Sequence, residues 1–203
     1  MKGTLFIISA PSGAGKTSLV KAILEKDPQL QVSISYTTRS PRPQEINGVH
    51  YHFVTVSTFQ EMLEKEDFLE HANVFDNYYG TSHVGLEQQL EQGKDIILEI
   101  DWQGAQQVRQ KIADAVSIFV LPPSKETLEQ RLRNRAQDSE EIIARRLKDA
   151  VSDMSHYNEF DYVVINDDFD IVFNELQYII KSQRLRLENQ YGRFKEQINQ
   201  LIS

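Results

Sequence analysis

The chain has 203 residues, of which 40% are hydrophobic and 26% are charged, with a formal net charge of −8 and no cysteine. These values fit a globular protein with one substantial core, and the lack of cysteine excludes disulfides and thiolate metal sites. The negative charge argues against general binding of nucleic acid. The short apolar run at the N-terminus indicates a buried strand instead of a signal peptide or membrane span. We therefore expect a cytoplasmic protein with neither a nucleic-acid nor a membrane partner.

Strand-like and helical patterns alternate along most of the chain. The apolar run "TLFIIS" (4–9) predicts a strand, and "KTSLVKAILEK" (16–26) has the apolar spacing of a helix. Further strands are expected at "DIILEID" (95–101), "VSIFVL" (116–121) and "DYVVIN" (161–166), with helices near "GLEQQLEQG", "AQQVRQKI", across 125–156, and from Asp170 onward with a break at Gly192. This alternation predicts an α/β fold, with a parallel sheet covered by helices on both faces.

Two segments interrupt the alternation and are expected to form inserted lobes. Residues 33–83 are rich in threonine, tyrosine, proline and arginine, with β-like pieces such as "HYHFVTV" and one helix, "STFQEMLEKEDF", for which Ser57 is the expected cap. Residues 122–150 carry a cluster of five arginines, Arg131, Arg133, Arg135, Arg145 and Arg146. The expected core is then 1–32, 84–121 and 151–203, within a single folding unit.

The stretch "APSGAGKT" (10–17) follows the first expected strand and opens the first expected helix. Backbone N–H groups of a glycine-rich turn at a helix N-terminus form a cradle for phosphate. Lys16 can reach the β and γ phosphates, and the Thr17 hydroxyl can bind Mg²⁺. Ala10 replaces the first glycine of the usual pattern, and the alternative is a glycine-rich turn with a chance lysine. The strand and helix on either side favour a P-loop that holds a nucleoside triphosphate.

A P-loop does not name the reaction. A GTPase would carry an N-K-x-D motif, which this chain lacks. Arg39 and Arg42, beside a proline-stiffened turn, suit a second phosphate, because guanidinium groups match its oxygens. Taken alone, this segment is better interpreted as a solvated basic loop.

Five segments in order carry a resemblance to a known family. They are "SAPSGAGKTSL", "SYTTRSPRPQEINGVHYHFV", "FLEHANVFDNYYGTS", "ILEIDWQGAQQVR" and "VINDD". Together they resemble the bacterial guanylate kinases over nearly the whole chain, from about Gly3 to Ile180. Ala10 is common in bacterial members, whereas Gln44 departs from the glycine of many relatives. The resemblance implies a P-loop core, a GMP-binding lobe (33–83) and an arginine-rich lid (122–150), and Mg²⁺-dependent phosphoryl transfer from ATP to GMP.

The resemblance also implies roles for individual residues. ATP would be bound by Ala10, Pro11, Ser12, Gly13, Ala14, Gly15, Lys16, Thr17 and Asn166, the last contacting adenine. The GMP phosphate would be held by Arg39, Arg42, Tyr51 and Tyr79, and guanine read by Ser35, Glu70, Thr81 and Asp101, with Gly80 in the same "NYYGT" segment. Catalytic charge would come from Lys16, Arg39 and the lid arginines Arg131, Arg135 and Arg146. Thr17, and Asp101 through water, would hold Mg²⁺.

The residue types suit these roles. A carboxylate accepts two hydrogen bonds and so matches the N1–H and amine of guanine, which adenine does not offer as a pair. Asp101 ends an expected parallel strand and so faces the ligand crevice, with Glu99 on the same side. The alternatives are an exposed acid at a helix end for Glu70, a helix-capping acid for Asp101, and ion-paired helix arginines in the lid. We take that last reading only for Arg133 and Arg145.

Two other functions remain open at this stage. One is a guanylate-kinase-like module that binds proteins without catalysis, and the other is a related kinase that acts on a different phosphorylated acceptor. Intact Lys16 and Thr17 argue against the first, and the guanine-reading set argues against the second. No evident reader of the ribose 2′-OH is present, so dGMP is an expected acceptor. The sequence leaves a homo-oligomer open.

Overall fold

The computed structural model describes residues 2–74, 76–134 and 140–203, and its centre is a five-stranded parallel sheet. The strand order across the sheet is β2-β7-β1-β8-β9, with β1 in the middle. The strands are β1 (Leu5–Ser9), β2 (Leu30–Val32), β7 (Asp95–Glu99), β8 (Val116–Leu121) and β9 (Tyr162–Ile165). The predicted α/β fold with a parallel sheet is thus confirmed.

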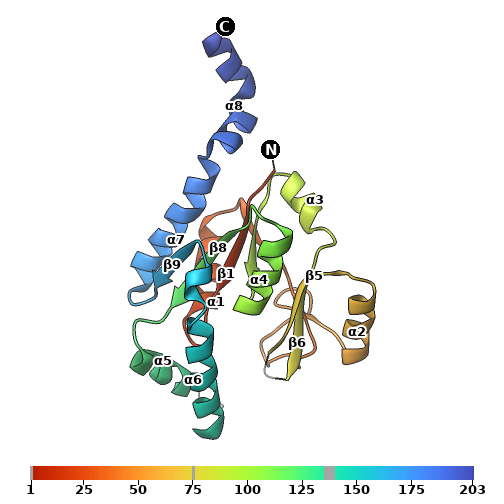
Figure 1. Cartoon of the computed structure of the whole chain (residues 1–203), viewed down its shortest axis with the longest axis vertical. Coiled ribbons are helices and arrows are strands. Elements are labelled where there is room, and N and C mark those ends of the chain that lie inside the picture. Colours follow the sequence, from red (N-terminus) through yellow and green to blue (C-terminus); the bar gives the residue numbers. More distant parts are fainter. Residues whose placement is uncertain (1, 75, 135–139) are drawn as a thin grey trace.

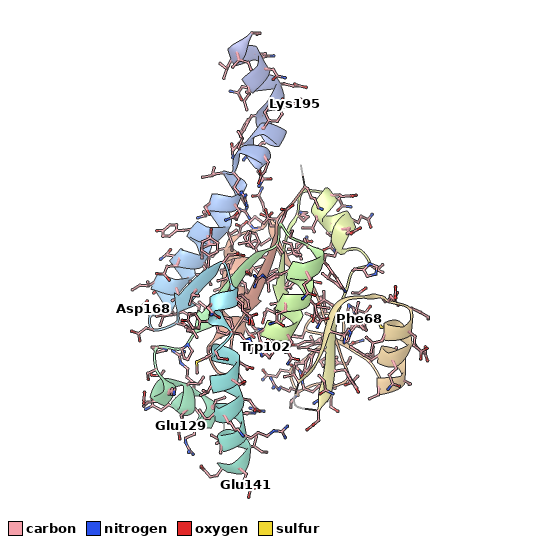
Figure 2. All side chains as sticks on the ribbon, in the orientation of Figure 1. Phe68, Trp102, Glu129, Glu141, Asp168 and Lys195 are labelled. Atoms are coloured by element: carbon pink, nitrogen blue, oxygen red, sulfur yellow. The ribbon has the colours of Figure 1, made fainter. Side chains whose placement is uncertain are left out.

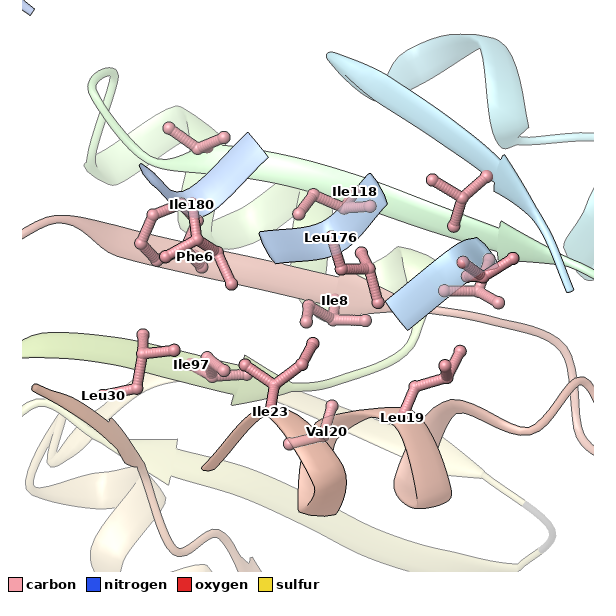
Figure 3. Close-up of a cluster of buried hydrophobic side chains, with 14 residues drawn as sticks. Phe6, Ile8, Leu19, Val20, Ile23, Leu30, Ile97, Ile118, Leu176 and Ile180 are labelled. Carbon is pink, nitrogen blue, oxygen red and sulfur yellow. The ribbon is translucent and has the colours of Figure 1, made fainter. Parts of the chain in front are cut away.

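Helices cover both faces of this sheet because its strands are apolar on both sides. Phe6 and Ile8 of β1 pack in one buried cluster with α1 (Lys16–Lys26) and α7 (Phe169–Arg184), as Figure 3 shows. Leu5 and Ile7 point the other way, into a cluster that includes residues of α3 (Leu86–Glu91) and α4 (Trp102–Lys111). Successive side chains of a strand alternate between faces, so a continuous apolar run requires a layer on each side.

A second, four-stranded sheet lies beside the core in the order β4-β3-β6-β5. Its strands are β3 (Tyr36–Thr37), β4 (His52–Phe53), β5 (Phe68–Val74) and β6 (Asn77–Ser82). Helix α2 (Val56–Glu64) covers it through Phe59, which is fully buried and stacks on Phe68 with ring centroids 4.5 Å apart. On the side of the core, Leu69 of β5 joins the cluster that contains α4 residues.

The boundaries of α2 differ from the prediction. The helix begins at Val56 and is capped by Thr55, whose hydroxyl accepts a hydrogen bond from the Thr58 N–H, so the expected Ser57 cap is wrong. The helix also ends earlier than Phe68, because Glu66 adopts a left-handed φ of 57° and the chain turns into β5. Phe68 therefore belongs to a strand instead of a helix.

The charged stretch after β8 forms two helices, α5 (Lys125–Arg133) and α6 (Glu140–Met154). They pack on each other through a small apolar cluster of Leu128, Leu132 and Ala150. A single turn, η1 (Tyr157–Glu159), connects α6 to β9.

The C-terminal helical region has two parts. Helix α7 packs on the sheet through Val172, Leu176 and Ile180, whereas α8 (Leu187–Ile202) contributes no buried residue and extends away from the body (Figure 1). The break falls between Arg184 and Leu187, so the prediction of a break at Gly192 is wrong. Gly192 is helical, and the irregular dihedral angles inside α8 belong to Phe194. Within the described residues, no helix is both long and apolar enough to cross a membrane.

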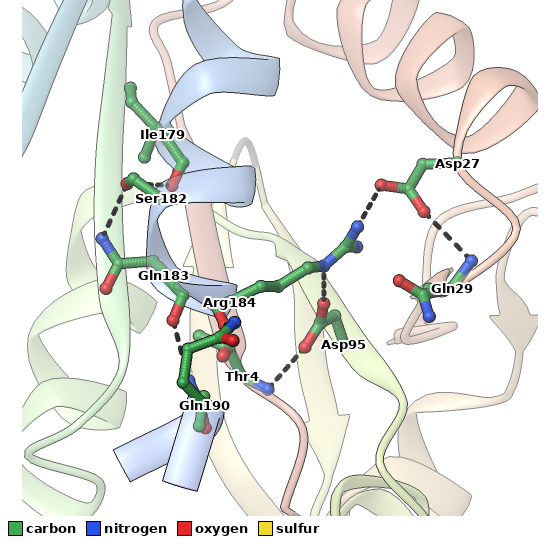
Figure 4. A network of polar contacts seen from close by, with 10 residues as sticks. Thr4, Asp27, Gln29, Asp95, Ile179, Ser182, Gln183, Arg184 and Gln190 are labelled. Carbon is green, nitrogen blue, oxygen red and sulfur yellow. Dashed lines mark hydrogen bonds and ion pairs between the residues drawn. The ribbon is translucent and has the colours of Figure 1, made fainter. Parts of the chain in front are cut away.

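A partly buried ionic network lies where β7 begins, at the end of the sheet opposite the P-loop, and Figure 4 shows its contacts. Arg184, at the end of α7, donates to Asp27 and to Asp95, each at 2.7 Å. Asp95 also accepts from the Thr4 main-chain N–H at 2.7 Å. The network therefore joins α1, the start of β7 and α7 around one guanidinium, in keeping with the bidentate geometry of arginine.

Candidate active site

The predicted phosphate loop leaves the carboxyl end of the central strand β1 and enters α1 at Lys16. Gly13 and Gly15 both have left-handed backbones, with φ of 92° and 96°. Only glycine adopts this region without strain, so the two glycines let the loop curl and aim its N–H groups inward. The sequence thus dictates a preformed cradle for phosphate at the N-terminus of α1.

Neighbouring elements hold this loop in place. The buried Asn166 side chain, just after β9, donates to the Ala14 carbonyl at 2.6 Å. Arg131 of α5 donates to the main-chain carbonyl of Asn166 at 3.0 Å and to that of Ala14 at 3.4 Å. Asn166 and Arg131 were expected to contact ATP or its phosphates, and in this structure they hydrogen-bond to the main chain and so brace the loop.

Gly15 has no room for a side chain, which makes a test of the loop possible. A Cβ at Gly15 would lie 2.3 Å from Nδ2 of Asn166, whereas one at Gly85, the left-handed N-cap of α3, would meet no atom within 4 Å. Both Gly15→Ala and Gly85→Ala pay the backbone strain of about 1–2 kcal/mol. We expect only Gly15→Ala to raise the KM for ATP as well, by at least roughly tenfold. Equal kinetic effects of the two variants would contradict this account of the loop.

A cavity of about 290 Å³ lies between the loop, the second sheet and α6. Its lining joins the loop to side chains of the lobe and of the β7–α4 connection. The predicted site residues among that lining are Ala10, Pro11, Ser12, Gly13, Gly15, Lys16, Thr17, Ser35, Arg42, Tyr51, Glu70, Tyr79, Asp101 and Arg146. Residues from four separate parts of the sequence thus meet around one cavity.

Glu70 lies at the lobe side of the cavity and is only 2% exposed. Burial raises its pKa to about 7, and the nearby charge of Asp101 acts in the same direction, while hydrogen bonds from Thr81 oppose the shift. Gly104 of α4 approaches so closely that a Cβ there would lie 2.5 Å from Glu70 Oε2. A buried carboxyl kept beside a cavity at a cost in stability is typical of a binding group.

Thr81 is fully buried and outside the cavity lining. Its hydroxyl lies 3.3 Å from that of Ser35, which does line the cavity. Gly80 is also outside the lining, and a Cβ there would lie 2.8 Å from the Phe68 ring. Thr81 therefore supports Glu70 through hydrogen bonds, and Gly80 allows the close packing of the lobe around Phe68.

Four groups gather where β7 ends. The Lys16 ammonium donates to the Ile100 carbonyl at 3.2 Å, and the Thr17 hydroxyl donates to Glu99 at 3.1 Å. Asp101 caps α4 by accepting from the Gly104 N–H at 2.9 Å, which is the alternative that the sequence offered for it. It nevertheless lines the cavity, and burial raises its pKa.

The two predicted phosphate arginines of the lobe are placed differently. Arg42 lines the cavity, whereas Arg39 is outside the lining, paired with Glu45 at 2.8 Å, its guanidinium carbon 5.5 Å from the Tyr51 ring centroid. Burial, with a contribution from Glu99, raises the pKa of Tyr51 to about 12, so its hydroxyl remains a hydrogen-bond donor.

Two functional candidates escaped sequence reasoning. Asp153 lines the cavity, and Glu45 engages Arg39. Strand alternation placed Glu99 on the side of Asp101, yet no local signal indicated Asp153, whose position depends on how α6 docks.

The predicted lid arginines divide into three cases. Arg146 lines the cavity, Arg131 braces the loop, and Arg135 lies outside the described residues. Arg133 and Arg145 make exposed ion pairs, with Glu129 and Glu140 and with Asp76 and Asp149 respectively. Both side chains thus form ion pairs, as we expected of them.

A P-loop on a five-stranded parallel sheet, facing a carboxylate-bearing lobe across one cavity, defines a nucleotide-binding phosphotransferase of the P-loop class. The family model described as guanylate kinase matches residues 2–183. Guanylate kinases from Escherichia coli (strain K12) and Methylobacillus flagellatus are 55% and 59% identical to the chain, which is covered completely, as are 99% and 100% of those proteins. The chain belongs to the guanylate kinase family, and it is a nucleoside monophosphate kinase.

Solved structures support the same assignment. The crystal structure of guanylate kinase from Anaplasma phagocytophilum superposes with a TM-score of 0.78 at 30% sequence identity. The match covers 92% of this chain and 88% of that one. The predicted resemblance to bacterial guanylate kinases is confirmed.

Proposed function

We propose that this protein transfers the γ-phosphoryl group of ATP to GMP, and also to dGMP, giving ADP and GDP or dGDP. The observation that carries the proposal is the single cavity that joins the phosphate loop to the buried carboxyl of Glu70. The protein would then consist of an ATP-binding core (1–32, 84–121, 151–203), a GMP-binding lobe (33–83) and a lid (122–150).

The lobe end of the cavity suits guanine. The ionised Glu70 carboxylate accepts hydrogen bonds from guanine N1–H and from the exocyclic amine, while the Ser35 hydroxyl is available to O6. Adenine lacks the N1–H donor and would leave a buried carboxylate short of a partner, at a cost of roughly 1–3 kcal/mol. Arg42, Tyr51 and Tyr79 also line the cavity and would hold the acceptor phosphate. Arg39 would join them by exchanging Glu45 for a phosphate oxygen.

The transfer itself requires positioning and charge neutralisation. The second proton of a phosphate monoester has a pKa near 6, so the attacking oxygen of GMP is mostly anionic at pH 7 and needs no general base. In the transfer this oxygen forms a bond to the γ-phosphorus as the bond to the ADP oxygen breaks, without a covalent enzyme intermediate. Lys16, Arg42 and Arg146 line the space where these charges meet, and would stabilise them.

The oxygen-rich end of β7 fits Mg²⁺, which prefers hard oxygen ligands and keeps several waters. The Thr17 hydroxyl would bind the ion directly, and Asp101 would orient its water shell, with Glu99 hydrogen-bonded to Thr17. When bound, Mg²⁺ neutralises charge on the β and γ phosphates.

The acceptor is tested by measuring ADP formation from ATP with GMP, dGMP, AMP, UMP or no acceptor. We expect GMP and dGMP to stimulate turnover, while AMP and UMP leave it near the background because neither base satisfies Glu70. Failure of GMP to stimulate turnover would contradict the proposal and favour a protein-binding module. A preference for another phosphorylated compound would favour the related-kinase alternative.

A further inference from the structure

Trp102 is the one tryptophan of the chain, and it lies at the N-terminal end of α4, where α6 ends (Figure 2). Its indole N–H donates to Asp153 of α6 at 3.1 Å. The His156 ring stacks on the indole, with centroids 3.5 Å apart and planes 7° from parallel. Two different contacts thus fasten the C-terminal end of α6 to the first residue of α4.

The segment after α6 strengthens this attachment. His156 pairs with Glu159 at 2.6 Å, and Glu159 in turn accepts from Gln106 of α4 at 2.7 Å. Arg109 of α4 donates to the main-chain carbonyl of Glu159. The base of α6 is therefore held against α4 by a continuous set of polar and stacking contacts.

The geometry of α6 connects this attachment to the cavity. Asp153 follows Arg146 by seven residues, which is close to two helical turns and about 10 Å along the axis, on the same face. Both residues line the cavity, while Ala150 packs toward α5. The direction of α6 at Asp153 thus sets where Arg146 lies in the cavity.

The contacts between Trp102 and α6 also lie next to Asp101, a residue expected to bind guanine. Trp102 directly follows Asp101, which caps α4 and lines the same cavity. Burial raises the pKa of Asp153, the charge of Asp101 adds to the shift, and the indole hydrogen bond opposes it. Burial therefore disfavours the ionised form of Asp153, and the hydrogen bond from the Trp102 indole stabilises it.

We propose that Asp153 is a positioning residue for phosphoryl transfer: by bonding the Trp102 indole under the stacked His156, it fixes the direction of α6 and thereby places Arg146 over the reacting phosphates. The inference rests on the role proposed above for Arg146. Asp153 makes no contact with substrate in this account, and its effect on turnover passes through Arg146.

The test compares Asp153→Leu, which removes the hydrogen-bond acceptor, with Asp153→Asn, which keeps one. Asp149→Leu, on the same helix at a half-buried position whose side chain is 43% exposed, is the matched control. We expect Asp153→Leu to lower kcat roughly ten- to hundredfold with little change in the KM for GMP, because a displaced Arg146 affects the transition state more than GMP binding. Asp153→Asn should recover most of the kcat, and Asp149→Leu should behave as the wild type.

The decisive measurement repeats Asp153→Leu in an Arg146→Ala background. If Asp153 acts through Arg146, the double variant has the same kcat as Arg146→Ala alone. If the two losses multiply, the positioning role is overturned. If Arg146→Ala alone turns over like the wild type, the role proposed for Arg146 fails and this inference falls with it.

Fluorescence gives a readout independent of activity, because Trp102 is the sole indole. Loss of the Asp153 hydrogen bond should shift the emission of unliganded Asp153→Leu, with no shift in Asp149→Leu. An unchanged emission spectrum in a folded Asp153→Leu protein would contradict the contact and overturn the proposal.

Discussion

Replacing Lys16 with alanine is expected to lower kcat by at least about a hundredfold while leaving the protein folded. The Lys16 ammonium lines the cavity at the first residue of α1, where it would neutralise the β and γ phosphates as charge develops during transfer. Its polar contact with protein is a hydrogen bond to the Ile100 carbonyl, so little folding energy depends on it. Steady-state ADP formation and thermal unfolding followed by circular dichroism would measure both effects.

Lys21→Ala is the matched control, because Lys21 is an exposed lysine of the same helix. It should leave kcat unchanged. GMP binding measured by calorimetry should survive in Lys16→Ala, since the acceptor is bound by the lobe. Normal turnover by Lys16→Ala would remove the loop from the mechanism.

Replacing Glu70 with glutamine is expected to lower kcat/KM for GMP by roughly a hundredfold. A carboxamide accepts one hydrogen bond from guanine but turns its own N–H₂ toward the second guanine donor. The wild-type KM for GMP should fall as pH rises from about 6 to 8, because only the ionised carboxylate accepts both bonds and its pKa is about 7. Glu70→Gln should keep only the smaller pH dependence that belongs to the phosphate of GMP, whose pKa is near 6.

Glu70→Gln should lower kcat/KM but raise the stability of the folded protein at high pH. Because the folded protein raises the Glu70 pKa from 4.5 to about 7, the folded state binds more protons than the unfolded state across this window. The free energy of unfolding should therefore fall as pH rises from about 4.5 to 7, by about 3 kcal/mol, and stay low above it. Glu70→Gln removes this loss, so it should melt at a higher temperature than the wild type at pH 8.

Glu64→Gln, an exposed position of α2 in the same lobe, controls for the general effect of removing a carboxylate. It should alter neither the KM for GMP nor the pH dependence of unfolding. A Glu70→Gln protein that is less stable than the wild type at pH 8 would contradict the buried-charge account. An unchanged KM would remove Glu70 from guanine recognition.

Features with a local cause were predictable from the sequence. The apolar run of β1 requires burial on both faces, and the glycines of "APSGAGKT" require left-handed backbone, so strand, loop and helix followed from neighbouring residues alone. Where local signals compete, the prediction failed. Thr55 and Ser57 both suit a helix cap, and in the structure Thr55 caps α2 while Phe59 of the same helix packs on the Phe68 ring.

Gly192 illustrates the same limit. A glycine weakens a helix by roughly 1 kcal/mol but does not end it, and the chain turns instead at Arg184, where the ion pairs with Asp27 and Asp95 terminate the packing of α7 on the sheet. The residues around Gly192 do not indicate that Arg184 pairs with Asp27 and Asp95, so the position of the break could not be predicted from them.

The parallel sheet, the phosphate loop and the residue types that suit guanine and phosphate were predictable, because each depends on the order and spacing of nearby side chains. The folded chain was needed to show that Asn166 and Arg131 brace the loop, that Arg39 is paired with Glu45, and that Asp153 meets Trp102. Such contacts join elements far apart in the chain, and they form only where the packed sheets and helices bring them within hydrogen-bond distance.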